Sequence, residues 1–227
     1  MASDSTTTGA PGVRRGFPED RPALVCYLMA GFPDREVSLE SLKSAAAAGA
    51  DVIELGVPYG DPLADGPVIA SAGYAARRGG TGLREAIEIA ATFRSEVPDG
   101  PPLLLMTYLN PMLRIGLAET ARLAIAAGVD GFIVPDMPPE EAGDWMETSA
   151  GLDTVFLAAP TSTDERLGVI GKLSSGFLYC VSTTGITGER AQLPPDLAAL
   201  VRRVKTFTEL PVAAGFGISR PGHILAL

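Results

Sequence analysis

The sequence predicts an α/β fold in which helices cover a parallel sheet that is either closed as a barrel or open and doubly wound. The first observation behind this prediction is that short apolar runs alternate with longer segments of helical spacing along the chain. Such alternation is typical of right-handed βαβ crossovers. The second observation is the length of 227 residues, which suits one domain of this kind. Seven apolar runs nearly complete an eight-stranded barrel.

The expected strands and helices follow one another in strict order. We predict strands in the apolar runs at residues 24–30, 52–55, 103–108, 131–134, 154–158, 177–181 and 211–214. Between them, Ala- and Leu-rich segments with helical spacing predict helices at residues 37–48, 83–96, 118–127, 139–149, 165–173 and 195–207. After the seventh run, residues 220–223 are typical of a helix start, and we expect no eighth strand before Leu227.

The composition narrows the classes of function. Hydrophobic residues make up 46% of the chain and charged residues 20%, which is enough apolar material for a folded core. The net charge of −9 argues against binding of nucleic acid or an anionic membrane, because clustered Lys and Arg bind such surfaces. We therefore expect a small-molecule substrate. A phosphate on it would be held by backbone N–H groups at helix N-termini.

The cysteines and the N-terminal segment indicate a reducing, cytoplasmic setting. Cys26 and Cys180 lie within apolar strand runs, so we expect buried reduced thiols and neither a disulfide nor a metal site. Residues 1–16 are rich in Ser, Thr and Gly and lack the apolar core of a signal peptide. No apolar run is long enough to predict a membrane span.

The segment at residues 54–67 carries the clearest candidate for catalysis, because it follows a strand at the end where parallel α/β enzymes place their active sites. Strand alternation puts Val52 and Glu54 on one face and Ile53 and Leu55 on the other, so Glu54 can point into the barrel. A carboxylate among apolar walls has a raised pKa and suits general acid/base work near neutral pH. The alternative is a structural carboxylate that caps a neighbouring loop.

The loop after Glu54 offers a second carboxylate. Its prolines and glycines hold Asp61 and Asp65 on a restrained connection. A charged Asp65 could accept a hydrogen bond from a substrate N–H that becomes cationic as Glu54 delivers a proton. A purely structural role, capping of a turn, fits Asp61 better.

Further loops after predicted strands are candidates to line the same cavity. Residues 181–190 form a hydroxyl- and glycine-rich loop that could close over a ligand or be a surface turn. Residues 213–221 lead from a strand into a helix, the arrangement by which backbone N–H groups hold a phosphate. The segments at residues 108–111 and 135–138 could line the cavity or cap helices, and we favour capping. The single histidine, His223, is expected to be exposed.

Six motifs taken in order identify a family resemblance. They are YLMAGFPD, ELGVPYGDPLADGP, TYLNP, VPDMP, YCVSTTGITGER and AAGFGISRP. Together they resemble the α subunit of tryptophan synthase over residues 24–221, and the second motif is highly specific for that family. The resemblance implies a (β/α)8 TIM barrel that cleaves indole-3-glycerol phosphate by a retro-aldol reaction into indole and glyceraldehyde 3-phosphate, in L-tryptophan biosynthesis. It also implies that this cytoplasmic lyase has no cofactor or metal of its own and that it joins a pyridoxal-phosphate-dependent β subunit in an α2β2 heterotetramer.

The resemblance also implies roles for individual residues. Glu54 matches the acid/base that protonates the indole ring carbon at the scissile bond, and Asp65 matches the carboxylate that steadies the indole N–H. Asp61 and Pro62 match residues of partner contact or loop closure. The implied substrate-binding residues are Tyr27, Tyr179, Thr187, Gly188 and Gly217, of which Thr187 and Gly188 lie in the closing sixth loop and Gly217 at the phosphate.

The chain departs from the family pattern at several points. Met29 stands where the family often has Thr, Gly60 where it often has Ser, and Thr183 where some members have Arg. We expect residues 1–20 to be a flexible tail in place of the usual N-terminal helix. Residues 21–227 are expected to form a single TIM-barrel domain without the eighth βα unit, which leaves the edges of the first and seventh strands unpaired.

Other functions share these residues. A stand-alone indole-3-glycerol-phosphate lyase that releases free indole would differ only in its independence of a β subunit. A non-catalytic subunit that regulates a β partner is a second alternative, although intact Glu54 and Asp65 argue against it. A generic phosphate-sugar barrel enzyme ranks last, because it gives no reason for the ELGVPYGDPLADGP motif.

Overall fold

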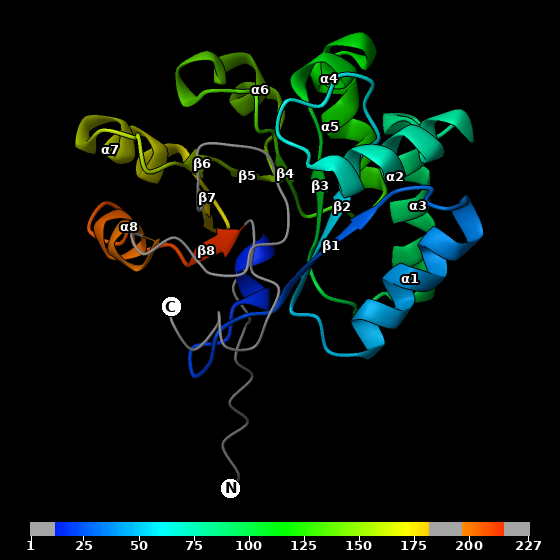
Figure 1. Ribbon diagram of the computed structural model, residues 1–227, viewed down its shortest axis with the longest axis horizontal. Helices are drawn as coiled ribbons and strands as arrows, with labels where there is room; N and C mark the ends of the chain where they lie inside the picture. The colour runs from blue at the N-terminus through cyan, green and yellow to red at the C-terminus, as the bar shows by residue number, and fades with distance from the viewer. Residues whose placement is uncertain (1–11, 182–196, 216–227) are drawn as a thin grey trace, which may run out of the picture.

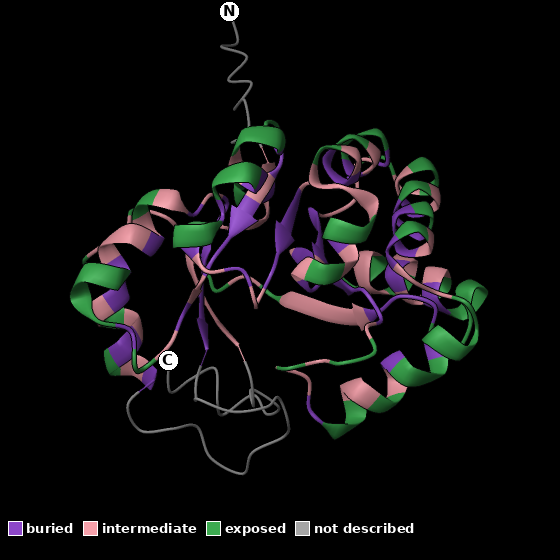
Figure 2. Ribbon diagram, turned by 90° about the horizontal axis from the view of Figure 1, so that it is seen from above, coloured by how far each residue is buried: buried purple, intermediate pink, exposed green. Residues whose placement is uncertain are grey.

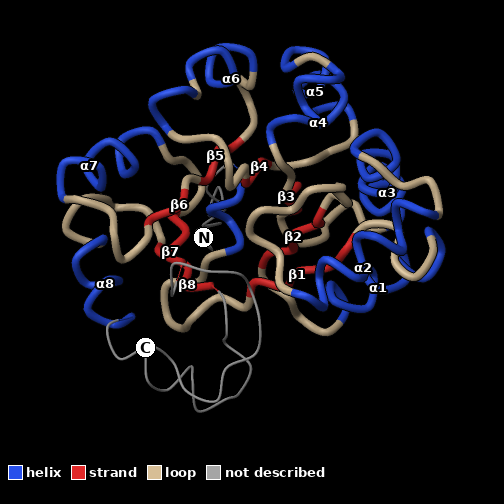
Figure 3. The backbone as a smooth tube through the Cα atoms, turned by 45° about the horizontal axis from the view of Figure 1, so that its top comes forward, coloured by secondary structure: helices blue, strands red, loops and turns tan. Residues whose placement is uncertain are grey.

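The computed structural model describes residues 12–181 and 197–215, in which parallel strands lie inside a ring of helices (Figures 1 and 3). The strands are β1 (Val25–Met29), β2 (Val52–Gly56), β3 (Leu103–Met106), β4 (Gly131–Ile133), β5 (Asp153–Val155), β6 (Leu157–Ala158), β7 (Leu178–Val181) and β8 (Val212–Gly215). The helices are η1 (Gly12–Gly16), α1 (Arg35–Ala47), α2 (Pro67–Arg78), α3 (Leu83–Glu96), α4 (Leu109–Ile115), α5 (Leu117–Ala126), η2 (Pro139–Glu141), α6 (Gly143–Thr148), α7 (Asp164–Leu173) and α8 (Leu197–Val204).

The strands pair in the order in which they occur along the chain. β1 to β5 form one parallel sheet and β6 to β8 another. Phe156 alone separates β5 from β6, and its carbonyl accepts a hydrogen bond of 3.1 Å from the Tyr179 backbone N–H. We therefore treat β5 and β6 as one bent strand, the predicted strand at residues 154–158. The parallel α/β prediction is confirmed in its barrel form, and within the described residues no pairing joins β1 to β8.

Both faces of the strands are buried, as expected for a parallel sheet covered by helices (Figure 2). Successive residues alternate between two apolar cores. Ile53 and Leu55 pack outward against the helices, whereas Val52 packs into the barrel interior. The other buried members of the interior core are Val13, Leu104, Ile133, Val155, Phe177, Tyr179 and Val181.

The segment at residues 12–17, which lies within the predicted tail at residues 1–20, fills the amino end of the barrel. Val13 is fully buried in the interior core, and its backbone N–H donates to Asp153 Oδ2 at 2.7 Å. The ring of Phe17 lies 5.2 Å from the ring of Phe177. Apolar anchors at Val13 and Phe17, scattered in a Gly-rich stretch, are too few to produce a helical or strand pattern in the sequence.

Two α-helices, α2 and α4, lie where none is predicted. α2 begins at Pro67, which suits the first position of a helix because its N–H would be unpaired there. α4 contains Pro111 within its first turn, where a missing N–H also costs little. The helix predicted at residues 139–149 is split into η2 and α6. The remaining predicted helices are present, although residues 195 and 196 at the predicted start of α8 lie outside the described part.

None of the described helices has both the length and the apolar character needed to cross a membrane. Cys26 is partly buried and Cys180 buried, both as free thiols. The helix start expected at residues 220–223, including His223, lies outside the described residues.

Candidate active site

Glu54 lies in the middle of β2 with its side chain in the barrel interior. Its backbone pairs with Tyr27 on β1 and with Leu104 on β3. The residue is only 2% exposed, and Oε1 has no hydrogen-bond partner among the described residues. The side chain therefore points into the barrel, as predicted, and its Oε1 caps no loop among the described residues.

The burial of Glu54 decides its protonation state. Removal from water disfavours the charged carboxylate and raises the pKa of Glu54 to about 8. The carboxyl therefore holds its proton near neutral pH and can exchange it readily there. Chemically, such a group can protonate a substrate atom that enters the barrel.

Tyr27 and Tyr179 lie on the same inner surface as Glu54. The Tyr27 ring leans over Gly56, where a Cβ atom would come within 2.0 Å of the Tyr27 hydroxyl. Tyr179 leans over Gly215 in the same way, at 2.1 Å. The glycines that end β2 and β8 thus make room for tyrosines from the preceding strands.

Burial raises the pKa of both tyrosines. The negative charge of Asp65 and then that of Glu54 raise the pKa of Tyr27 further, and the charge of Glu54 also raises that of Tyr179. Both hydroxyls therefore stay protonated over the whole physiological range. The shared electrostatic influence means that Tyr27 lies close to both carboxylates.

Asp65 lies in the loop between β2 and α2 and is partly buried. The hydroxyl of Tyr108 donates to Asp65 Oδ1 at 3.1 Å and accepts from the Ala64 backbone N–H at 3.0 Å. Burial raises the pKa of the Asp65 carboxyl, and the hydrogen bond from Tyr108 opposes that rise. The structure thus brings Glu54, Asp65 and Tyr27 together at the carboxyl end of the barrel.

Tyr108 is the residue that sequence reasoning missed. Lining of the cavity and capping of a helix are both open for the segment at residues 108–111 from the sequence, with capping favoured. Tyr108 is the N-cap residue of α4, but its hydroxyl makes no capping bond; the side chain is buried, with 4% exposure, and bonded to Asp65. The sequence does contain a signal for a role of Tyr108 in the site. The residue lies at the end of a predicted strand, and the active sites of barrel enzymes lie at the carboxyl ends of the strands. Capping is correct for the segment at residues 135–138, because Asp136 Oδ1 accepts from the Leu109 N–H at 2.9 Å, at the start of α4.

The other candidates divide into exposed residues and residues outside the described part. Asp61 is exposed and Pro62 partly exposed, near Leu63, which is 69% exposed. Thr187, Gly188 and Gly217 lie outside the described residues, as does Thr183. Among the residues that are described, no cluster of His, Cys, Asp and Glu could hold a metal ion.

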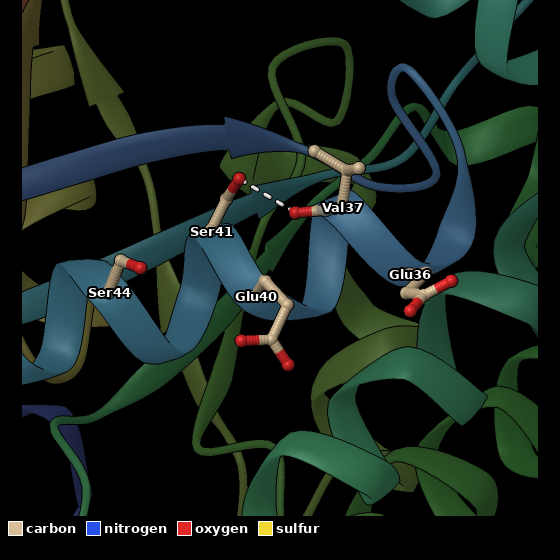
Figure 4. Close-up of a pocket in the computed structure, with 5 residues that line it drawn as sticks. All are labelled: Glu36, Val37, Glu40, Ser41 and Ser44. Atoms are coloured by element: carbon tan, nitrogen blue, oxygen red, sulfur yellow. Dashed lines mark hydrogen bonds between the residues drawn. The ribbon is translucent and has the colours of Figure 1, made fainter.

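A surface depression on α1 does not belong to this site (Figure 4). It is lined by residues of that helix alone: Glu36, Val37, Glu40, Ser41 and Ser44. The Ser41 hydroxyl is bonded within the helix, to the Val37 carbonyl at 2.7 Å. The depression therefore offers only the outer surface of one helix.

Comparison with known sequences finds matches over most of the chain. The family model described as tryptophan synthase alpha chain matches residues 16–227. The tryptophan synthase alpha chain of Carboxydothermus hydrogenoformans is 50% identical over 205 residues, which cover 89% of this chain and 76% of the relative. That of Solibacter usitatus is 49% identical over 213 residues, with 92% and 78% covered.

Solved structures agree with the sequence matches. A tryptophan synthase structure from Mycobacterium tuberculosis superimposes with a TM-score of 0.80 at 42% identity, covering 91% of this chain and 77% of that one. A chain from the tryptophan synthase α2β2 complex of Pyrococcus furiosus gives a TM-score of 0.83 at 42% identity, covering 90% and 82%. By fold, by sequence and by the carboxylates that its barrel brings together, this chain belongs to the tryptophan synthase alpha chain family.

Proposed function

We propose that this chain cleaves indole-3-glycerol phosphate into indole and glyceraldehyde 3-phosphate, the lyase reaction of its family in L-tryptophan biosynthesis. The observation that carries the proposal is Glu54, a buried carboxyl in the barrel interior with a pKa of about 8, whose Oε1 has no partner within the described ranges. Such a group holds the proton that this reaction needs at neutral pH.

The proposed chemistry divides two roles between two carboxyl groups. Glu54 donates its proton to the indole ring carbon that carries the glycerol phosphate chain. The ionised Asp65 accepts a hydrogen bond from the indole N–H and stabilises the positive charge that develops on the ring. The carbon–carbon bond then breaks, its electron pair returns to the ring, and the adjacent hydroxyl becomes the aldehyde. Glu54, ionised by the first step, takes up the proton of that hydroxyl.

The remaining site residues bind and enclose the substrate in this proposal. Tyr27 and Tyr179 form walls of the cavity beside Glu54, as supported by their place over Gly56 and Gly215. Thr187 and Gly188 would belong to the closing sixth loop, and Gly217 would contact the phosphate. These three assignments rest on the family resemblance alone.

We further propose a β subunit as the partner, in an α2β2 assembly. The Pyrococcus furiosus structure is of such a complex. Asp61 and Pro62 are the proposed contact or closure residues, and the nearby Leu63 and Val68, 69% and 82% exposed, supply apolar surface for a partner. Pyridoxal phosphate belongs to the β subunit, and this chain works without a cofactor of its own. A cytoplasmic location is proposed, supported by the free thiols of Cys26 and Cys180.

Replacement of Glu54 tests the proposal directly. Glu54→Gln keeps the shape of the side chain but removes the exchangeable proton, so we expect indole release to fall by about a hundredfold or more. Release is measured by chromatography with and without an added β subunit. Glu36→Gln, on the outer surface of α1, is the matched control and should keep wild-type activity.

Two outcomes would contradict the proposal. One is a wild-type chain that releases no indole under either condition, which favours the non-catalytic subunit. The other is Glu54→Gln with more than a tenth of wild-type activity, which removes Glu54 from the chemistry. Equal rates with and without the β subunit would instead identify a stand-alone lyase.

A further inference from the structure

Tyr108 joins the loop after β2 to the end of β3. Its ring is buried, and its hydroxyl contacts two consecutive residues of that loop. The Ala64 N–H can only donate, so it occupies a lone pair of the hydroxyl oxygen. The single hydroxyl proton is directed at Asp65 Oδ1. One side chain therefore restrains both the backbone of the loop and its carboxylate.

The ring of Tyr108 is itself held in place by its neighbours. The Tyr59 ring, from the same loop, lies 5.1 Å away at an angle of 31°. The Tyr59 hydroxyl accepts from Asn110 Nδ2 at 3.1 Å, which ties the loop to the first turn of α4. Asp136 in turn holds the start of α4. The hydroxyl of Tyr108 thus has a defined direction, set by two loops and a helix.

The contacts of Asp65 are one-sided. Within the described part of the chain, Tyr108 is the one residue with a hydrogen bond to the Asp65 carboxyl, and it uses Oδ1. Oδ2 therefore keeps its acceptor capacity for a ligand. A hydroxyl that donates to Oδ1 stabilises the ionised carboxylate over the acid, because the hydrogen bond to a charged acceptor is the stronger one.

We propose that Tyr108 is a positioning residue that keeps Asp65 ionised and turns its second oxygen toward the N–H group of the substrate. This inference rests on the proposed function of Asp65 and adds the residue that makes this function possible. Tyr108 does not touch the reacting atoms in this scheme. It acts by opposing the effect of burial, which raises the pKa of the Asp65 carboxyl.

The test measures the ionisation of Asp65 separately from activity. Tyr108→Phe removes the hydroxyl and keeps the ring, so we expect the pKa of Asp65 to rise by about one unit. The carboxyl carbon of Asp65 is followed by NMR in the full chain labelled with 13C-aspartate, and Asp65→Asn assigns its signal. In the pH profile of kcat/KM, the apparent pKa on the acidic side should rise by a similar amount. The loss of activity is therefore larger at pH 6 than at pH 8.

Two further variants sharpen the test. Tyr74→Phe makes the same chemical change in an exposed tyrosine of α2 and should leave the Asp65 signal unmoved. Incorporation of 3-fluorotyrosine at position 108 retains the ring and makes the hydroxyl a stronger donor. It should lower the pKa of Asp65, a shift opposite to that of Tyr108→Phe, and it decides the question even where Tyr108→Phe does not fold.

A double variant completes the design. In an Asp65→Asn background, Tyr108→Phe should cause little further loss of kcat/KM, because its effect passes through Asp65. The inference is overturned by an Asp65 pKa that is the same in all Tyr108 variants, or by a full additional loss in the Asp65→Asn background. A wild type that releases no indole while the Asp65 signal shifts as expected would refute the proposed function and leave the role of Tyr108 intact.

Discussion

Glu54 illustrates how burial creates a proton donor from an ordinary carboxylic acid, since no Lys or Arg of the described segments forms an ion pair with it. Its pKa rises from 4.5 to about 8, and burial is the cause. Each pKa unit corresponds to about 1.4 kcal/mol of preference for the neutral form. Asp65, partly buried and bonded to Tyr108, has a smaller tendency toward the neutral acid because the hydrogen bond opposes burial. The two environments separate the acid from the charged acceptor.

The raised pKa of Glu54 should make the stability of the fold depend on pH. Below about pH 4.5 the Glu54 carboxyl is protonated in both the folded and the unfolded chain. Its ionisation then takes nothing from the free energy of unfolding. Between pH 4.5 and 8 the unfolded chain loses this proton while the folded chain keeps it, so stability falls as the pH rises. The amide side chain of Glu54→Gln cannot ionise, so the stability of this variant should not fall in this way. Between pH 5 and pH 8, its free energy of unfolding should rise relative to that of wild type by on the order of 3 kcal/mol.

Urea denaturation of the two proteins at both pH values measures this difference. Glu36→Gln should follow the wild-type curve at both pH values. An equal stability difference between Glu54→Gln and wild type at pH 5 and pH 8 would mean that Glu54 ionises normally in the folded chain.

At the scale of strands, the glycines that end β2 and β8 make room for tyrosine side chains. A tyrosine of the neighbouring strand leans over each of them, Tyr27 over Gly56 and Tyr179 over Gly215. Neither glycine has a positive φ angle, so space and not backbone conformation is the reason for its choice. The pairing of a strand-end glycine with a neighbouring tyrosine is thus a property of two adjacent strands together.

A methyl group at Gly56 should therefore disturb the site. In Gly56→Ala, the new Cβ would meet the Tyr27 hydroxyl and ring at 2.0 to 2.8 Å, which forces the ring away from its place beside Glu54. We expect a loss of about 1–3 kcal/mol in unfolding free energy and a marked drop in kcat/KM. Thermal unfolding and the indole assay measure the two effects.

Gly143, the first residue of α6, serves as the matched control. A Cβ at this position meets nothing within 4 Å, so Gly143→Ala should be neutral or slightly stabilising. Wild-type stability and activity in Gly56→Ala would show that the Tyr27 ring moves aside freely and has no fixed role.

At the scale of the whole molecule, the two ends of the barrel have different tasks. The carboxyl end carries the candidate site, and the amino end is filled by residues 12–17. Asp130, just before β4, forms ion pairs with Arg15 and with Arg94 of α3, the latter at 3.0 Å. These contacts attach the N-terminal segment to the starts of the central strands. Stability and chemistry should therefore respond separately to mutation.

Val13→Ala tests this separation. Val13 is fully buried in the interior core, so its truncation leaves a cavity and should cost about 1–3 kcal/mol. Well below the unfolding temperature, kcat/KM should stay close to wild type because the site lies at the opposite end. Val68→Ala, at a position 82% exposed, should change stability by less than about 0.5 kcal/mol. A loss of activity in folded Val13→Ala would instead couple the two ends.

Local pattern was sufficient for most of the architecture. Apolar runs and helical spacing are local patterns of a few residues, so the strands and the main helices are predictable from the sequence. The alternation at residues 52–55 likewise predicts the inward direction of Glu54. The patterns failed where a proline lies in the first turn of a helix, as in α2 and α4, and where two isolated apolar residues, Val13 and Phe17, complete a distant core.

The sequence by itself determined the parallel α/β fold, the family, and the segment that carries Glu54 and Asp65. Tertiary structure alone decided that Glu54 is fully removed from water, that Tyr27 lies near both carboxylates, and that Tyr108 bonds to Asp65. The physical reason is that side-chain direction within a strand follows from local alternation. Burial, charge and hydrogen bonding depend on which strands and loops, distant in sequence, meet at the end of the barrel.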